Sequence, residues 1–260
     1  MRNYRLILEY DGTDFAGFQY QTGQRTVQNT LEEAISKLAH ASGRVAGAGR
    51  TDAGVHALGQ VASFWAELSV PANRLASALN SLLPGDLSVV AAAEAEAGFH
   101  ARYSAVSRRY LYIIRQGRQR SGIWDRYSWR VGNEISLAAM KAGSRFLIGE
   151  MDFATWGTST CRSQSTVRQV KEIKAGRRGR FVLIWIEANG FLKHMVRRMV
   201  GTLVEVGLGR RDPQDIQVMT HRRDIRLAGP VAPAAGLCLL RVRYQQMEWD
   251  KSNGDENLFG

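Results

Sequence analysis

The sequence predicts an α+β fold in which helices pack on a largely antiparallel sheet. Strand-like and helix-like segments alternate along the 260 residues. Hairpin signals are frequent, and the clearest surrounds Gly176-Arg177-Arg178-Gly179. The two halves show a similar order of elements, although no sequence repeat relates them. We therefore expect two similar α/β halves that together form a central sheet flanked by helices.

Apolar periodicity defines the elements of the first half. Alternating apolar and polar residues indicate an N-terminal strand, which the turn signal Asp11-Gly12-Thr13 ends. Apolar residues at helical spacing follow Thr26, a suitable N-cap, and a second helical stretch stops before Pro84. The elements expected here are strands over Tyr4–Tyr10 and Val61–Trp65 and helices over Val27–Leu38 and Leu75–Leu83.

The second half repeats this theme. Val170–Lys174 and Phe181–Ala188 are expected to form the hairpin. The segment Thr155–Gln169 is rich in Ser and Thr and lacks apolar periodicity, so it is expected to be a mobile loop. The other elements expected here are strands over Tyr110–Arg115 and Leu237–Tyr244 and helices over Leu137–Leu147 and Phe191–Val206, the last of them buried.

A domain boundary is expected between Ala101 and Ser107. It gives an N-terminal α+β half over residues 1–104 and a C-terminal α+β half over residues 105–246. Residues 247–260 form a polar tail that is expected to be disordered.

Composition predicts a cytoplasmic protein. The hydrophobic content of 45% and the charged content of 23% are typical of a globular chain. No apolar run approaches the roughly 20 residues that a membrane span needs, and the N-terminus has no apolar signal-peptide core. Cys161 and Cys238 have no CxxC spacing, so we expect reduced thiols and neither a disulfide nor a zinc site.

The charge balance predicts a polyanionic partner. The 35 Lys and Arg residues exceed the 24 Asp and Glu residues by 11, and only six of the 35 are lysine. Arginine suits phosphate groups because its planar fork can donate two parallel hydrogen bonds. A basic cleft that binds RNA is therefore expected. A solvated basic surface without such a partner is the simpler alternative.

The segment Gly49-Arg50-Thr51-Asp52-Ala53-Gly54-Val55-His56-Ala57 has the most chemical content. Glycines on both sides of Asp52 permit a tight backbone that a ligand can approach closely. Arg50 and Asp52 are two residues apart, so in an extended chain their side chains project to the same side. From this spacing alone, an Asx turn closed by a local ion pair is the simpler interpretation.

This segment closely resembles the catalytic motif of the tRNA pseudouridine synthase I (TruA-like) family. Further segments resemble other family motifs in the expected order, so the likeness covers nearly the whole chain. These segments are Tyr10-Asp11-Gly12-Thr13 with Phe15-Ala16-Gly17-Phe18-Gln19, Phe99-His100-Ala101-Arg102 with Arg108-Arg109-Tyr110, Phe191-Leu192-Lys193-His194-Met195-Val196-Arg197 with Gly201, and Ala232-Pro233 with Gly236-Leu237. Two residues depart from the family pattern, Phe18 in place of Trp and Cys238 in place of Tyr.

The resemblance implies a role for each matching residue. Asp52 is expected to be the nucleophile, and Tyr110 to stack on the target base. Arg197 is expected to form an ion pair with Asp52, and Arg50 to enter the space that the flipped base leaves. The resemblance also implies tRNA as the partner, uridines 38, 39 and 40 of the anticodon arm as targets, and a homodimer as the functional unit.

The implied reaction explains these residue types. Pseudouridine forms when the N1–C1′ glycosidic bond breaks, the uracil turns, and C5 joins C1′. No atoms are gained or lost overall, so no cofactor and no metal are expected. A carboxylate can form a transient covalent adduct and divide one difficult step into easier ones. Whether it attacks the ribose or the base is left open.

Clustered arginines are the expected phosphate contacts. We expect Arg108, Arg109, Arg177 and Arg178 to bind substrate; the other clusters are Arg115/Arg118/Arg120, Arg210-Arg211 and Arg222-Arg223. Taken singly, each cluster is more simply interpreted as a solvated surface pair than as a specific contact.

Two other functions remain possible at this point. A noncatalytic RNA-binding module could use the same basic surface. A metal-dependent hydrolase could use Asp11, Asp14 and His56, although no metal-ligand spacing is present. We interpret His56 as a structural residue.

Overall fold

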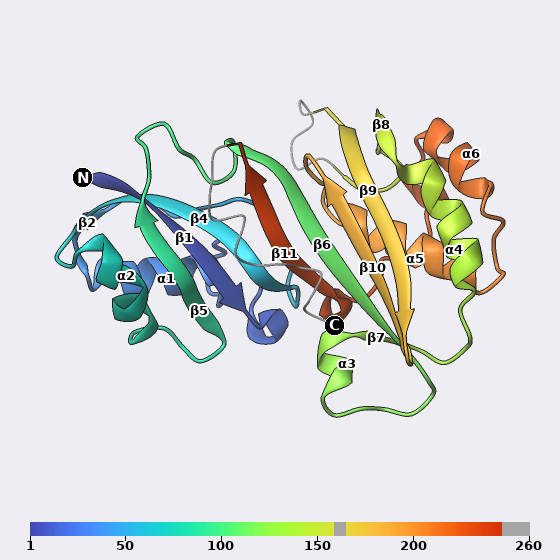
Figure 1. The fold of residues 1–260 in the computed structure, drawn as a ribbon, viewed down its shortest axis with the longest axis horizontal. Helices are drawn as coiled ribbons and strands as arrows, with labels where there is room; N and C mark the ends of the chain where they lie inside the picture. Colours follow the sequence, from blue (N-terminus) through green and yellow to red (C-terminus); the bar gives the residue numbers. More distant parts are fainter. Residues whose placement is uncertain (159–164, 246–260) are drawn as a thin grey trace. The chain divides into compact units, whose positions relative to one another are not determined.

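The structure is a computed structural model that describes residues 1–158 and 165–245. The chain folds into two compact units (Figure 1). Unit 1 contains residues 1–108 and the chain from Leu239 on, and unit 2 contains residues 109–238. Each unit combines helices with a mainly antiparallel set of strands, so the predicted α+β class is confirmed.

In unit 1 the strand order is β5-β1-β4-β11, and β2 and β3 pair with β4. β1 is antiparallel to both β4 and β5, with Leu6 opposite Ala62 of β4. The strands are β1 (Arg2–Tyr10), β2 (Ala39–Ser42), β3 (Ala46–Gly47), β4 (His56–Leu68), β5 (Leu87–Glu94) and β11 (Leu237–Tyr244), which enters unit 1 at Leu239. The helices are η1 (Gly12–Asp14), a 3₁₀ turn, α1 (Val27–Ser36) and α2 (Ala72–Asn80).

In unit 2 the strand order is β6-β10-β9-β8, and the short β7 pairs in parallel with β6. Helix α4 contacts both α5 and β9, and in Figure 1 α4 and α6 lie beside the β8 edge. The strands are β6 (Ala105–Gln116), which enters unit 2 at Arg109, β7 (Trp129–Val131), β8 (Gly149–Asp152), β9 (Val167–Arg178) and β10 (Phe181–Ala188). The helices are α3 (Trp124–Tyr127), α4 (Leu137–Ser144), α5 (Met195–Gly207) and α6 (Asp215–Arg222), with 3₁₀ turns η2 (Arg145–Leu147), η3 (Ile225–Leu227) and η4 (Ala234–Gly236).

The apolar patterns place the core as predicted. Tyr4, Leu6, Leu8 and Tyr10 of β1 are all buried, because successive residues of a strand face opposite sides. Thr26 caps α1, and its hydroxyl accepts the backbone N–H of Asn29.

Several boundaries differ from the prediction. β4 begins at His56, five residues before the expected strand, because it pairs with β1 from Ala57 on. α2 ends at Asn80, so the half-exposed Leu82 lies outside it. α5 begins only at Met195, because His194 has a φ of 64° that a helix cannot accommodate.

The hairpin exists, but its turn is Gly179-Arg180. Gly176, Arg177 and Arg178 belong to β9, and Arg178 pairs with Phe181. Within the expected mobile loop Thr155–Gln169, Thr158 forms a β-bridge with Lys193 and β9 starts at Val167. Residues 159–164 and the predicted tail 247–260 lie outside the described residues. Within the described part, no helix has the length and apolar character to cross a membrane.

Candidate active site

Asp52 lies on the loop between β3 and β4 of unit 1. The backbone N–H of Val55 donates to the carbonyl of Asp52 at 3.2 Å, which closes a β-turn over residues 52–55. Gly54 has a φ of 78° at the third position of this turn, where a type II turn requires a positive φ. Asp52 is half-buried and Arg50 is exposed, so the turn presents the carboxylate at the surface of unit 1.

The chain after β1 packs directly against this loop. Phe18 N–H donates to the carbonyl of Thr51 at 3.0 Å, and Gly54 N–H donates to the carbonyl of Phe15 at 3.3 Å. A Cβ on Gly12 would lie only 2.0 Å from the carbonyl oxygen of Val55, so only glycine allows this approach. The two segments that resemble family motifs, residues 10–19 and 49–57, are therefore joined through their backbones around Asp52.

Buried polar side chains hold the loop from the sheet side. The Gln60 side chain exchanges two hydrogen bonds with Gly49, donating to its carbonyl at 2.7 Å and accepting its N–H at 3.3 Å. The hydroxyls of Tyr10 and Thr51 are 2.9 Å apart and hydrogen bonded. Gln60 was not predicted as a site residue, because no local pattern marks a glutamine in a strand as the partner of a loop eleven residues away.

Arg108 does not have the placement of a surface phosphate contact. It is buried, and its guanidinium donates to the carbonyls of Ala48, Arg102 and Ala105 at distances between 2.6 and 3.3 Å. Arg108 thus joins the start of the Asp52 loop to the chain before β6.

His56 is buried beside the same loop. Its Nδ1 accepts the backbone N–H of Gly12 at 3.1 Å and lies 3.2 Å from Oδ1 of Asp11. This contact joins the start of β4 to the end of β1, which agrees with a structural role. Among the described residues, no group of three or more His, Cys, Asp or Glu side chains could hold a metal ion.

In unit 2, Tyr110 lies on β6 and is almost fully buried. Its ring packs edge-on against Phe191, with centroids 5.3 Å apart and an interplanar angle of 87°. Phe191 is part of the family-like motif that leads into α5. The aromatic packing fixes the orientation of the Tyr110 ring within unit 2.

Arg197 lies in the first turn of α5 and is half-buried. Its Nε donates to the carbonyl of Ala232 at 2.7 Å, and the Ala232 N–H donates back to the Arg197 carbonyl at 3.1 Å. The neighbouring Pro233 carbonyl accepts the hydroxyl of Tyr112 at 2.8 Å. Burial raises the pKa of Tyr112, and the positive charge of Arg197 opposes this shift. The segment Ala232-Pro233, which resembles the last family motif, therefore holds Arg197 of the preceding motif in place.

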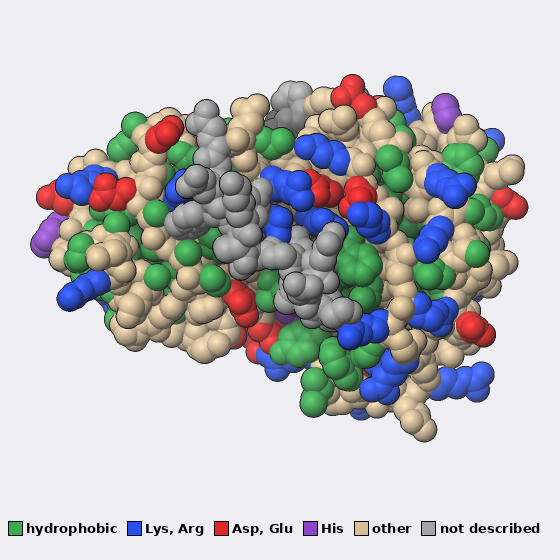
Figure 2. All heavy atoms as spheres, in the orientation of Figure 1, with side chains coloured by type: hydrophobic (Ala, Val, Ile, Leu, Met, Phe, Trp, Pro, Cys, Tyr) green, Lys and Arg blue, Asp and Glu red, His purple; other side chains and the backbone are tan. Residues whose placement is uncertain are grey.

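The other predicted arginines differ in placement. Arg109 lies 3.6 Å from a carboxylate oxygen of Glu172, and the Arg177 guanidinium donates to the Gln116 side chain and to the Ile135 carbonyl. Arg178 is exposed beside the turn Gly179-Arg180. Basic side chains gather over this end of the hairpin and β7 in Figure 2.

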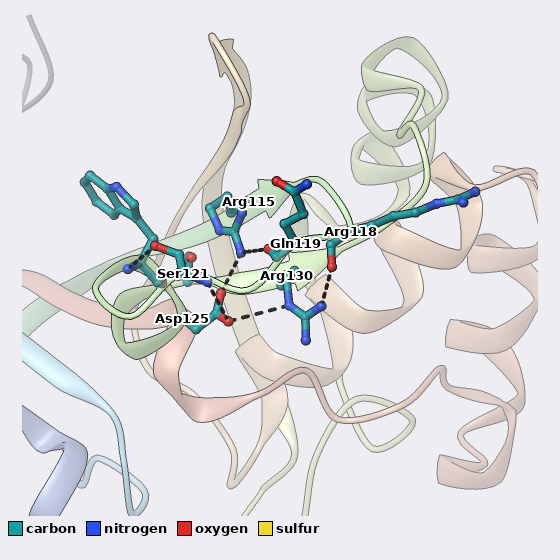
Figure 3. Close-up of polar contacts among 8 residues, drawn as sticks. Arg115, Arg118, Gln119, Ser121, Asp125 and Arg130 are labelled. Atoms are coloured by element: carbon teal, nitrogen blue, oxygen red, sulfur yellow. Dashed lines mark hydrogen bonds and ion pairs between the residues drawn. The ribbon is translucent and has the colours of Figure 1, made fainter.

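Arg115 also differs from the expectation for its cluster, because it is buried and its guanidinium contacts Asp125 and Gln119 (Figure 3). It donates to Asp125 at 2.7 Å and to the carbonyl of Gln119 at 2.8 Å. Arg130 lies 3.6 Å from the same carboxylate and donates to the carbonyl of Arg118. The hydrogen bond from Arg115 lowers the pKa of Asp125 below its ordinary value. These contacts hold the loop over residues 117–127.

Comparisons with known proteins point to one family. The model of a family described as tRNA pseudouridine synthase matches residues 6–104 and 144–245. The tRNA pseudouridine synthase A of Geobacter sulfurreducens is 42% identical over 244 residues, which are 94% of this chain and 100% of that protein. The tRNA pseudouridine synthase A of Thermoanaerobacter sp. (strain X514) is 42% identical with the same coverage.

Among solved structures, a crystal structure of a Cbf5-Nop10-Gar1 complex resembles this fold weakly. Its TM-score is 0.39 at 11% identity, with 91% of this chain and 49% of that chain covered.

The sequence matches define the class of protein: an enzyme that isomerises uridine in RNA. The chain belongs to the tRNA pseudouridine synthase family, and its reaction is the conversion of uridine to pseudouridine in tRNA.

Proposed function

We propose that this enzyme uses Asp52 as its nucleophile on uridines 38, 39 and 40 of the tRNA anticodon arm. The observation that supports Asp52 most directly is its presentation on the surface of a turn whose backbone is fixed on both sides. Phe18 N–H holds the residue before it and Gly54 N–H holds the turn after it. A half-buried carboxylate on a rigid turn can approach a substrate without a rearrangement of its own loop.

The other residues have roles that follow from their chemistry. Tyr110, with its ring orientation fixed by Phe191, stacks on the target base after the base leaves its helical stack. Base flipping costs a few kcal/mol, and aromatic stacking can return about 1–3 kcal/mol per base. Arg197 supplies the positive charge that stabilises the ionised Asp52, and Arg50 occupies the space that the base vacates.

The proposed reaction first breaks the N1–C1′ bond and then forms the C5–C1′ bond. Attack of the Asp52 carboxylate accompanies cleavage of the N1–C1′ bond, and the uracil remains in the site. After the ring turns, a C5–C1′ bond forms, the bond to Asp52 breaks, the proton on C5 is lost to solvent, and N1 takes up a proton from solvent. Product and substrate have the same atoms, so the protein needs to bind, orient and hold charge but not to supply a group.

RNA binding uses the exposed arginines of unit 2. Arg178 at the β9–β10 turn is free of the internal hydrogen bonds that its neighbour Arg177 makes in the described structure. We propose that Arg178 makes the main phosphate contact. Arg177 and Arg109 contribute less to phosphate binding, because each already has a contact within the protein. We also propose that the enzyme acts as a homodimer in the cytoplasm. Sedimentation velocity of the purified protein tests whether it is a dimer.

Asp52→Asn tests the nucleophile. The variant keeps the shape of the side chain but removes its charge, so we expect no pseudouridine in unmodified tRNA transcripts and tRNA binding within about 3-fold of wild type. Mapping of pseudouridine by nucleotide shows at the same time whether positions 38 to 40 are the targets. Turnover by Asp52→Asn near the wild-type rate would overturn the assignment of Asp52.

A transcript with 5-fluorouridine at the targets adds a second measurement. Fluorine at C5 cannot leave as a proton, so wild type should stop at an enzyme–RNA adduct or a rearranged fluorinated product. Asp52→Asn should give neither species. An adduct that forms equally well in Asp52→Asn would show that another residue is the nucleophile.

A further inference from the structure

We infer that three buried side chains of unit 1, Tyr10, Gln60 and Arg108, are positioning residues for Asp52; we call them the polar frame. This inference rests on the proposed role of Asp52 as the nucleophile. None of the three lies in the nine-residue segment that carries Asp52. Each contacts a residue between Ala48 and Thr51, immediately before the nucleophile.

Gln60 gives the strongest contact of the frame. Its side chain is fully buried on β4, where an apolar residue would ordinarily fill the core. Its amide pairs with both polar groups of Gly49 and also donates toward the Tyr10 hydroxyl at 3.4 Å. Because a buried amide without partners is costly, the side chain is fully used only when Gly49 occupies this place.

Tyr10 extends the frame to the residue next to Asp52. Its hydroxyl lies between Gln60 and the hydroxyl of Thr51, which is 2.9 Å away and buried. Tyr10 ends β1, so the contact fixes Thr51 to the sheet of unit 1. A phenylalanine ring would fill the same space in the core, so the hydroxyl is the group that makes this contact with the loop.

Arg108 holds the other end of the frame. Its Nε and one terminal nitrogen both donate to the carbonyl of Ala48, at 3.2 and 2.9 Å. The same guanidinium donates to the carbonyls of Arg102 and Ala105. All four of these hydrogen bonds end on backbone carbonyls, so Arg108 holds the backbone of Ala48 to the chain at Arg102 and Ala105, as a positioning residue would.

The frame explains how a loop without regular structure can hold a nucleophile precisely in place. Sites that act by orientation require geometry within about 0.5 Å, and a displacement of 1 Å can cost about 100-fold in rate. Residues 48, 49 and 51 are each fixed to a strand or to the chain before β6, so Arg50 and Asp52 project from a defined backbone. The carboxylate is thus placed before RNA binds.

The test compares Gln60→Leu with a matched control, Asn80→Leu. The Asn80 amide also exchanges two hydrogen bonds with a single residue, Val89, but at the α2–β5 contact. Both variants remove a reciprocal pair of amide hydrogen bonds to the backbone of unit 1. At saturating tRNA, we expect Gln60→Leu to lower the single-turnover rate about 10- to 100-fold with tRNA Kd unchanged. Asn80→Leu should stay within about 2-fold of wild type.

Conservative variants cover the case in which Gln60→Leu does not fold. Tyr10→Phe deletes one hydroxyl from an otherwise intact core, and we expect a 3- to 10-fold lower rate, in line with roughly one lost hydrogen bond. Arg108→Met should lower the rate at least as much as Gln60→Leu, and Arg108→Lys should recover part of it because a cationic hydrogen-bond donor group remains. Arg115→Met, which also removes a buried arginine from a loop anchor, should lower the melting temperature without this loss of rate.

Asp52→Asn, measured beside these variants, separates the two ideas. If Asp52→Asn turns over tRNA, the proposed nucleophile fails whatever the frame variants show. If Asp52→Asn is inactive but Tyr10→Phe and Gln60→Leu keep wild-type rates, the positioning role fails alone. A rate loss in Asn80→Leu equal to that in Gln60→Leu would also overturn the inference, because general destabilisation would then explain both.

Discussion

Two glycines bring the chain after β1 against the Asp52 loop. A Cβ on Gly12 would lie 2.0 Å from the carbonyl oxygen of Val55, and one on Gly17 would lie 2.8 Å from that of Thr51. Gly17 also has a φ of 100°, which L residues rarely adopt. Both obstacles are backbone atoms, so a new side chain can be accommodated only if one of the two segments moves.

Gly12→Ala is therefore expected to lower the free energy of unfolding by about 2–4 kcal/mol, and Gly17→Ala by about 1–3 kcal/mol. Gly85→Ala is the control, because its Cβ would meet nothing within 4 Å and its φ is not positive. Urea unfolding measures all three variants. An alanine at Gly12 as well tolerated as one at Gly85 would contradict the described approach of the two segments.

Arg197 has both a structural contact and a proposed electrostatic role. Its Nε donates a hydrogen bond to the carbonyl of Ala232. The proposed stabilisation of the ionised Asp52 carboxylate requires only a positive charge at this position. Arg197→Lys should therefore keep part of the turnover, and Arg197→Leu should lose about 100-fold or more. Rates at saturating tRNA distinguish the two. Equal rates in Lys and Leu variants would show that charge at this position is not used.

At the scale of elements, long periodic segments were predictable and short ones were not. β1, α1 and β10 have enough residues for a clear period, and the structure confirms them. β2, β3, β7 and β8 have only two to four residues each, so no period can develop in the sequence. The start of α5 depends on the left-handed His194, which no apolar pattern reveals.

The candidate site shows the same limit. The motif around Asp52 is contiguous, so the sequence alone marks it. The side chains that hold it come from positions such as Tyr10 and Arg108, which are 41 residues from Thr51 and 60 residues from Ala48 along the chain. Strand pairing brings these partners together. The sequence did not predict which residues of neighbouring strands lie opposite one another.

The loop over residues 117–127 supports a prediction on pH. The hydrogen bond from Arg115 lowers the pKa of Asp125 from its ordinary value of 3.8, so folding favours the ionised carboxylate. This stabilisation is fully present above the unfolded pKa and is lost as pH falls through the lower folded value. Asp125→Asn should thus cost stability at neutral pH, and the difference from wild type should shrink below about pH 4.

Urea unfolding of both proteins between about pH 7 and pH 3 measures this difference, with each protein compared at the same pH. A difference that stays constant across the whole range would show that the charge of Asp125 does not contribute. Hydrogen exchange of the Ser121 amide, which donates to Asp125 at 3.2 Å, gives a local measure of the same contact.

At the scale of the whole molecule, some of the 35 Lys and Arg side chains form internal ion pairs, which leave the net charge of +11 unchanged. Arg25 pairs with Asp86 at 2.6 Å and Arg226 with Asp224 at 2.7 Å, so these arginines already have anionic partners. Arg178 and Arg180 frame the exposed β9–β10 turn, and Figure 2 shows basic side chains around that region. An arginine can bind a polyanion when it is exposed and is not already paired with a carboxylate.

Salt dependence tests this distinction. Each phosphate contact that an arginine makes releases counterions, which contributes about 0.7–0.9 to the slope of log Kd against log salt. Replacing Arg178 and Arg180 with alanine should weaken tRNA binding and lower the slope by about 1 to 2, while the single-turnover rate at saturating tRNA stays unchanged. Arg226→Ala is the matched control, since it removes an exposed arginine that is already paired with Asp224, and its slope should equal that of wild type. Filter binding of a tRNA transcript at several salt concentrations gives the three slopes. If the double variant keeps the wild-type slope, the β9–β10 turn does not contact RNA, and if Arg226→Ala flattens the slope as much, net charge alone determines binding.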